Sequence, residues 1–91
     1  MGNISEPMSD LQFQILDAIY FVEPLQNILD EVDFPRPVVL DEMKNMIDKG
    51  WVQVMQMDEV ANDYVRTNIY DSDNLQEYQF LATKEGLLRR N

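Results

Sequence analysis

The chain contains neither cysteine nor histidine. Without cysteine it can form no disulfide, carry out no thiol catalysis and build no cysteine-ligated zinc site. Without histidine it lacks the commonest general base, the commonest metal ligand and the side chain that titrates near neutral pH. Only three glycines are present, and none forms part of a glycine-rich phosphate loop. These absences argue against an enzyme, and we expect no catalytic residue, cofactor or metal.

Long hydrophobic runs are also missing. No stretch approaches the ~20 consecutive apolar residues that span a bilayer. The N-terminal sequence "MGNISEPMSD" has neither the basic start nor the apolar core of a signal peptide. We therefore expect a cytoplasmic protein with no membrane partner. Its 91 residues predict one domain over residues 9–91, after a flexible tail at 1–8, with a core so small that a dimer partner would help stabilise it.

Positive charge is scarce: seven lysines and arginines face seventeen acids, giving a formal net charge of -10. Residues 64–91 contain four acids and four bases, so the remaining thirteen acids and three bases lie in residues 1–63. Binding to a phosphate backbone requires clustered bases, and a negative field repels a polyanion over about a Debye length. The composition therefore disfavours nucleic acid and favours basic partners.

Apolar spacing predicts two helices at the start of the domain. Ser9 or Asp10 is a suitable N-cap, and apolar residues recur at helical spacing over residues 11–22. Pro24 ends this helix and begins a second, shorter one that runs to about Val32.

A third helix is predicted from about Pro37 to Lys49, and Gly50 is well placed as its left-handed cap. The stretch "WVQVMQM" (51–57) then reads as a strand. Residues 63–70 are a possible further strand, and "DSDN" (71–74) is typical of a turn or a short capped helical turn.

The last two predicted elements are a strand and a helix. "EYQFLA" (77–82) alternates in the manner of a strand, with Tyr78 and Phe80 on one face, and we expect it to pair with the strand at 51–57. Thr83 is expected to cap a short C-terminal helix, "KEGLLRR", whose final bases favour the helix dipole.

Three segments in this order resemble the winged-helix (winged helix-turn-helix) superfamily of bacterial and archaeal regulators. "ILDAIY…PLQNILDEV" resembles its first two helices, "LDEMKNMIDKGWVQVM" the recognition helix running into the first wing strand, and "YQFLATKEGLLRR" the close of the wing. The resemblance covers about residues 10–90. It implies an α+β fold with a three-helix core, a two- or three-stranded β-wing and a short C-terminal helix.

In DNA-binding members, the third helix meets base edges and the wing meets phosphates. The recognition-helix surface implied here consists of Val38, Asp41, Glu42, Lys44, Asn45 and Asp48. The implied wing lies between Asp58 and Asp73. If DNA binds, the phosphate contacts expected are Arg36, Lys44, Lys49 and Arg66.

Both of these surfaces are rich in acids, which are poorly suited to binding near phosphates. We therefore interpret the chain as a non-enzymatic winged-helix module that acts through protein contacts, with weak or no DNA binding. The alternative is a DNA-binding transcriptional regulator of the same superfamily. Tyr20 and Phe21 cannot both face one core, so they are possible anchors for a protein partner or a homodimer.

Two acidic stretches suggest other chemistry only weakly. Asp71–Asn74 contains alternating acids, as a calcium loop does, but it lacks the glycine and the bidentate glutamate of that motif. Asp30, Glu31 and Asp33 are close in sequence, yet acid–base catalysis needs a pocket as well. Solvated surface positions are the better interpretation of both stretches.

Overall fold

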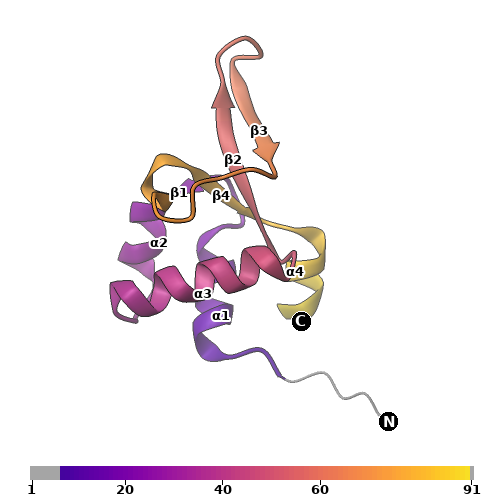
Figure 1. Ribbon diagram of the computed structural model, residues 1–91. Helices are drawn as coiled ribbons and strands as arrows, with labels where there is room; N and C mark the ends of the chain where they lie inside the picture. Colours follow the sequence, from indigo (N-terminus) through magenta and orange to yellow (C-terminus); the bar gives the residue numbers. More distant parts are fainter. Residues whose placement is uncertain (1–6, 91) are drawn as a thin grey trace.

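Four α-helices and a four-stranded antiparallel sheet form the part of the chain that the computed structural model describes, residues 7–90 (Figure 1). The helices are α1 (Asp10–Ala18), α2 (Leu25–Glu31), α3 (Arg36–Asp48) and α4 (Lys84–Arg90). The strands are β1 (Glu23–Pro24), β2 (Val52–Asp58), β3 (Asp63–Thr67) and β4 (Gln79–Ala82), and a 3-10 turn, η1, spans Leu75–Glu77. The α+β class agrees with the expectation from sequence.

Helix α1 begins where the sequence predicts but ends earlier. The Ser9 hydroxyl accepts a hydrogen bond from the Gln12 backbone N–H at 3.2 Å, and the Gln12 side chain accepts one from the Ser9 N–H at 2.9 Å, forming a capping box. The expected continuation to Val22 is wrong. After Ala18 the chain leaves the helix, and the Ile19 carbonyl accepts a hydrogen bond from the last N–H of β4 at 2.9 Å.

Strand β1 was not predicted from sequence. Its two residues pair with β4, Glu23 opposite Phe80 and Pro24 opposite Gln79. A two-residue segment carries no measurable alternation, and proline is confined to edge strands because it has no N–H to donate. The local sequence therefore argues against a strand at this position. In the structure, however, β1 pairs with the outer edge of β4 and makes β4 an interior strand.

Helix α3 ends in the predicted glycine cap. Gly50 has a φ of 81°, in the left-handed region that glycine tolerates best. Its N–H donates to the Ile47 carbonyl at 3.0 Å, and the Trp51 N–H donates to the Met46 carbonyl at 2.9 Å. This pair of bonds is the Schellman arrangement, which satisfies the free carbonyls of the last helical turn.

The sheet has the order β1-β4-β2-β3 and places a hairpin outside the body of the molecule. Val54 of β2 pairs with Phe80 of β4, which confirms the expected pairing of these two strands. The possible strand at 63–70 is present as β3 and ends at Thr67, whereas β4 begins at Gln79, later than expected. The β2–β3 hairpin projects away from the helices (Figure 1).

The core lies between the helices and the inner face of the sheet. Its fully buried side chains come from α1, α2, α3, β2 and β4, and Leu75 of η1 is buried beside them. The largest are Phe80, Ile15, Leu16, Ile19, Ile28, Met43 and Met46. Among residues 7–90, no helix has the length and apolarity needed to cross a membrane.

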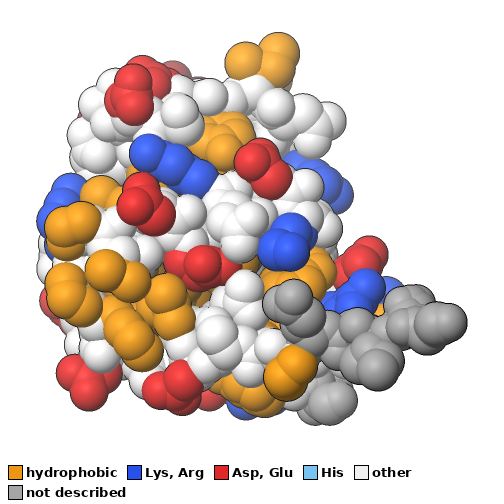
Figure 2. Space-filling model, turned by 60° about the horizontal axis from the view of Figure 1, so that its bottom comes forward, with side chains coloured by type: hydrophobic (Ala, Val, Ile, Leu, Met, Phe, Trp, Pro, Cys, Tyr) orange, Lys and Arg blue, Asp and Glu red, His pale blue; other side chains and the backbone are white. Residues whose placement is uncertain are grey.

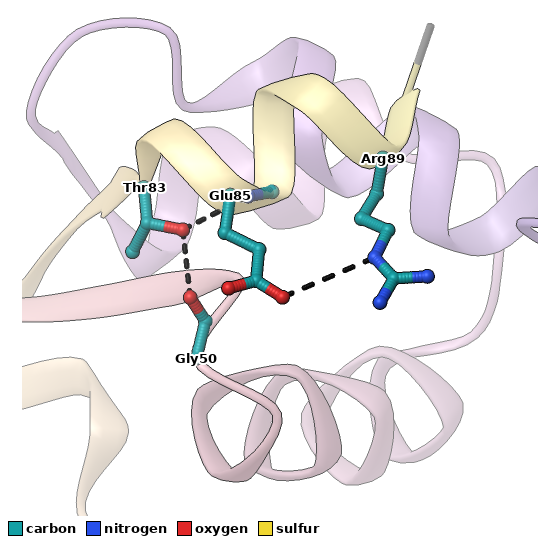
Figure 3. Close-up of polar contacts among 5 residues, drawn as sticks. Gly50, Thr83, Glu85 and Arg89 are labelled. Carbon is teal, nitrogen blue, oxygen red and sulfur yellow. Dashed lines mark hydrogen bonds and ion pairs between the residues drawn. The ribbon is translucent and has the colours of Figure 1, made fainter.

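A buried threonine fastens α4 to the end of α3 (Figure 3). The Thr83 hydroxyl donates to the Gly50 carbonyl at 2.7 Å and accepts from the Gly86 N–H at 2.9 Å. The Thr83 backbone N–H also donates to the Trp51 carbonyl at 3.0 Å. Thr83 is therefore the predicted N-cap of α4, and its hydroxyl also satisfies a carbonyl at the α3 cap.

We expect Thr83→Val to lower the free energy of unfolding by about 1–3 kcal/mol, because valine keeps the shape but leaves the Gly50 carbonyl and the Gly86 N–H without their partner. Thr83→Ser keeps the hydroxyl and should lose much less. Urea denaturation at equilibrium measures both. A larger loss in Thr83→Ser than in Thr83→Val would show that the methyl packing, not the hydroxyl, holds α4.

Gly86 makes the closest approach of α4 to the rest of the chain. A Cβ atom built on Gly86 would lie 2.4 Å from the Trp51 carbonyl oxygen, which is backbone and cannot rotate away. We expect Gly86→Ala to cost about 1–3 kcal/mol or more through this overlap, despite alanine's better helix propensity. The control is Glu85→Ala, at an exposed position on the same helix, for which thermal unfolding should show little change.

Candidate functional site

The outward side of α3 carries the implied recognition-helix residues. Asp41, Asn45 and Asp48 are exposed, Val38 is 42% exposed, and Lys44 is half-buried. This side therefore presents acids, an amide and one base along a single helix. The face is available to a partner, but its charge is mixed.

Glu42 lies at the margin of this stripe and faces α1. Its carboxylate accepts hydrogen bonds from the Gln12 side-chain amide at 2.8 Å and from the Asn45 amide at 2.9 Å. The side chain is half-buried. It joins α3 to α1, so of the acids predicted on the third helix, Asp41 and Asp48 are the ones free to meet a partner.

The tip of the β2–β3 hairpin, residues 58–63, is acidic and held by local hydrogen bonds. The Asp58 carboxylate accepts from the Val60 N–H at 3.0 Å and from the Ala61 N–H at 3.4 Å. Asn62 adopts a φ of 56°, and the Val60 side chain at the apex is 98% exposed. The tip therefore presents an apolar side chain in a fixed loop, between acids.

A polar hollow of about 280 Å³ lies between α3, β2 and the end of β3. Asp48, Arg66 and Tyr70 are among the side chains that line it. Burial raises the pKa of the Tyr70 phenol above its ordinary value of 10.0, and the negative charge of Asp48 raises it further. The Tyr70 ring stands edge-on to Tyr78, with 6.2 Å between the ring centroids. Carboxylate, guanidinium and neutral phenol here offer hydrogen bonds to a ligand, but no activated nucleophile.

The basic side chains do not gather on the α3–hairpin face. Lys49 and Arg89 lie 5.2 Å and 6.0 Å from the Trp51 ring, at the corner between α3 and α4. Arg90 forms an ion pair with Asp17. Figure 2 shows the Lys and Arg side chains separated by Asp and Glu on the face in view, without a continuous positive stripe. The predicted phosphate contacts are Arg36, Lys44, Lys49 and Arg66. Of these, Lys49 lies beside α4 and not on the α3–hairpin face.

The two possible partner anchors differ in their surroundings. Tyr20 is 48% exposed, and its hydroxyl accepts a hydrogen bond from Arg90 at 3.0 Å. The Arg90 guanidinium also lies 5.4 Å from the Tyr20 ring centroid. Phe21 is 78% exposed. Tyr20 is thus part of the contact between α1 and α4, whereas Phe21 is the one more available to a partner.

The acidic turn at 71–74 satisfies its own carboxylate. Asp71 accepts from the Asn74 side-chain amide at 2.6 Å and from the Asp73 N–H at 3.0 Å, and these bonds lower the pKa of Asp71. The geometry is that of a solvated turn. Within residues 7–90, no group of three or more acidic side chains is arranged to hold a metal ion.

No protein-family model matches this chain, and no curated protein or solved structure matches it at a significant level.

Sequence reasoning missed the hollow beside Tyr70 and the cluster around Trp51. The hollow depends on the path of residues 68–70 across the end of α3, which alternation does not encode. The Trp51 cluster has a weaker signal in the sequence: Lys49 ends the third predicted helix, and Arg89 is in the last turn of the C-terminal helix, where the sequence indicates only an interaction with the helix dipole.

The hollow provides a test of the site geometry. We expect Asp48→Asn to lower the pKa of Tyr70 toward 10.0 without reaching it, because burial is the larger cause. A raised folded-state pKa favours the neutral phenol. Its contribution to stability is therefore complete below the ordinary pKa and is lost as the pH rises through the folded-state value.

Titration of carbon-13-labelled tyrosine rings by NMR measures this pKa, with Tyr70→Phe assigning the resonance. Asp41→Asn, on the same helix, is the control that should leave the Tyr70 titration unchanged. An unaltered Tyr70 pKa in Asp48→Asn would contradict the placement of Asp48 beside the phenol.

Proposed function

We propose that this chain is a non-enzymatic winged-helix-like module that acts through protein contacts and binds DNA weakly or not at all. The order of three helices, a hairpin, a return strand and a terminal helix supports the winged-helix assignment. The observation that carries the functional part is the charge of the surface formed by α3 and the β2–β3 hairpin, the surface that reads DNA in binding members of the superfamily.

That surface holds more acids than bases. The acids are Asp41, Asp48, Asp58, Glu59 and Asp63, and the bases are Arg36, Lys44 and Arg66. Specific DNA binding generally neutralises ~6–10 phosphates, each through a nearby base. Three bases among five acids cannot supply this counterion-release term, so a duplex placed here would meet net repulsion.

The same surface suits a protein partner with a basic face. Its acids project from a rigid helix and from a preorganised loop, which reduces the entropy that binding would cost. Opposite charges on a partner would increase the association rate and fix the orientation of the complex. The exposed apolar side chains of Val38 and Val60 stand among these acids and supply contact area that charge alone does not.

A charge-reversal experiment tests this proposal. We expect the wild-type protein to show no binding to a mixed-sequence duplex at ~50 mM salt, where non-specific binding is strong. Asp41→Lys with Asp48→Lys should create weak binding that disappears as salt is raised, because it gives the α3 face a positive charge. Fluorescence anisotropy of a labelled duplex measures both proteins.

The matched control is Asp30→Lys with Glu77→Lys, which changes the net charge by the same amount at exposed positions on α2 and η1, outside α3 and the β2–β3 hairpin. Binding by the control as strongly as by the α3 variant would show that net charge alone matters, not the placement of α3. Micromolar, salt-sensitive binding by the wild-type protein would instead support the DNA-binding regulator.

A further inference from the structure

Two surfaces that lie far apart on the molecule are complementary in charge, and each has an exposed apolar side chain at its centre. The first is the hairpin tip, residues 58–63, defined above. It projects farthest from the helices (Figure 1), and its Val60 side chain is 98% exposed. Glu59 and Asp63 lie on either side of this apolar apex and are themselves exposed. The tip is therefore a narrow, acidic protrusion with an apolar point.

The second surface is an open hollow of about 580 Å³ on α4, here named the α4 hollow. It is lined by Lys84, Glu85, Leu88 and Arg89, and Leu88 is 64% exposed. Lys49 is close by, because it and Arg89 both lie against the Trp51 ring. An apolar side chain bordered by bases is the counterpart of the hairpin tip.

The bases of the α4 hollow are weakly engaged within the chain. The Arg89 side chain lies 3.9 Å from the Glu85 carboxylate, and both side chains are about half exposed (Figure 3). Exposed pairs at this spacing along a helix contribute little to stability. Lys49 and Lys84 make no ion pair with any residue of the described range 7–90. These cations are available to a carboxylate from outside.

We propose that the hairpin tip of one copy docks into the α4 hollow of a second copy of this chain. Val60 would contact Leu88, and Glu59 and Asp63 would approach Lys84 and Arg89. This inference rests on the proposed function, and it identifies the protein partner as a second copy of the same chain. The local attraction is between unlike charges in a chain that otherwise carries excess acid, so the α4 hollow is the best-suited acceptor on this molecule for its own acidic tip.

The contact is directional. In Figure 1 the tip lies at the far end of the β2–β3 hairpin, well away from α4, so one copy cannot fill its own hollow. A head-to-tail contact of this kind leaves one tip and one hollow free after each step, and it therefore builds open chains unless the rotation closes a ring. A contact between a loop and one helix is small, which makes the association weak and reversible.

Salt acts on this contact in two ways. The net charge of -10 on each copy opposes approach at low ionic strength. At ~0.15 M salt the Debye length is about 8 Å, which screens this long-range repulsion while closely placed charges still attract. The measurements therefore belong near this salt concentration.

Sedimentation velocity of the full chain, with two complementary variants, tests the proposal. The tip variant is Glu59→Lys with Val60→Lys, and the hollow variant is Lys84→Glu with Leu88→Glu. We expect the wild-type mass to rise beyond dimer with concentration. Each variant alone should associate about tenfold or more weakly, because one lost anchor of ~1.4 kcal/mol already changes affinity tenfold.

The mixture of the two variants is the decisive sample. The tip variant keeps an intact hollow and the hollow variant keeps an intact tip, so an equimolar mixture should form a one-to-one heterodimer and nothing larger. In the NMR spectrum of nitrogen-15-labelled tip variant, addition of unlabelled hollow variant should shift amide signals of α4. Glu31→Lys with Ile69→Lys, which likewise replaces one acid and one exposed apolar residue, should associate as the wild type does.

Three outcomes would overturn the inference: a wild-type protein that stays monomeric at millimolar concentration, variants that associate as the wild type does, or a mixture that stays monomeric. Circular dichroism of each variant shows whether it is folded, and a misfolded pair is replaced by the single changes Val60→Lys and Leu88→Glu. The DNA experiment is independent. Absent DNA binding together with absent self-association defeats only this inference, whereas DNA binding by the wild type defeats the proposed function.

Discussion

The Thr83 hydroxyl, buried between the end of α3 and the start of α4, is the interaction on which the arrangement of the C-terminal half depends. It serves two helix ends at once, accepting from the Gly86 N–H and donating to the Gly50 carbonyl. The two glycines make this possible in different ways. Gly50 allows the left-handed turn that brings its carbonyl toward Thr83, and Gly86 leaves room for the Trp51 carbonyl against α4.

This junction also determines where charge is placed. By holding α4 against Trp51, it brings Arg89 next to Lys49, the residue that caps the end of α3. The acids of α3 and of the hairpin lie on the outward surface that these two elements form. Four of the seven bases, Lys49, Lys84, Arg89 and Arg90, therefore lie in or beside α4, whereas Arg36, Lys44 and Arg66 remain among the acids of α3 and the hairpin.

Much of this architecture was predictable from local signals. Ser9, Gly50 and Thr83 each indicate a helix end, because capping depends on hydrogen bonds and backbone angles within a few residues. All three predicted caps are confirmed. The misses have a common cause. The early end of α1 and the existence of β1 depend on β4, which lies almost sixty residues later in the chain, and no local pattern reports that pairing.

The candidate surfaces show the same difference between features that follow from local sequence and features that depend on how distant elements pack. The family resemblance implied that Asp41 and Asp48 lie on the exposed side of the third helix, and the helical spacing of the apolar residues agrees with this, because a helix has one buried stripe. Neither could show that Glu42 bonds to Gln12, since that contact depends on how α1 crosses α3. The sequence pattern also did not indicate that the surface around Lys84 and Leu88 could complement the surface around Val60. A surface for association is a property of two distant parts of one fold, so only the assembled shape allows their charges and apolar groups to be compared.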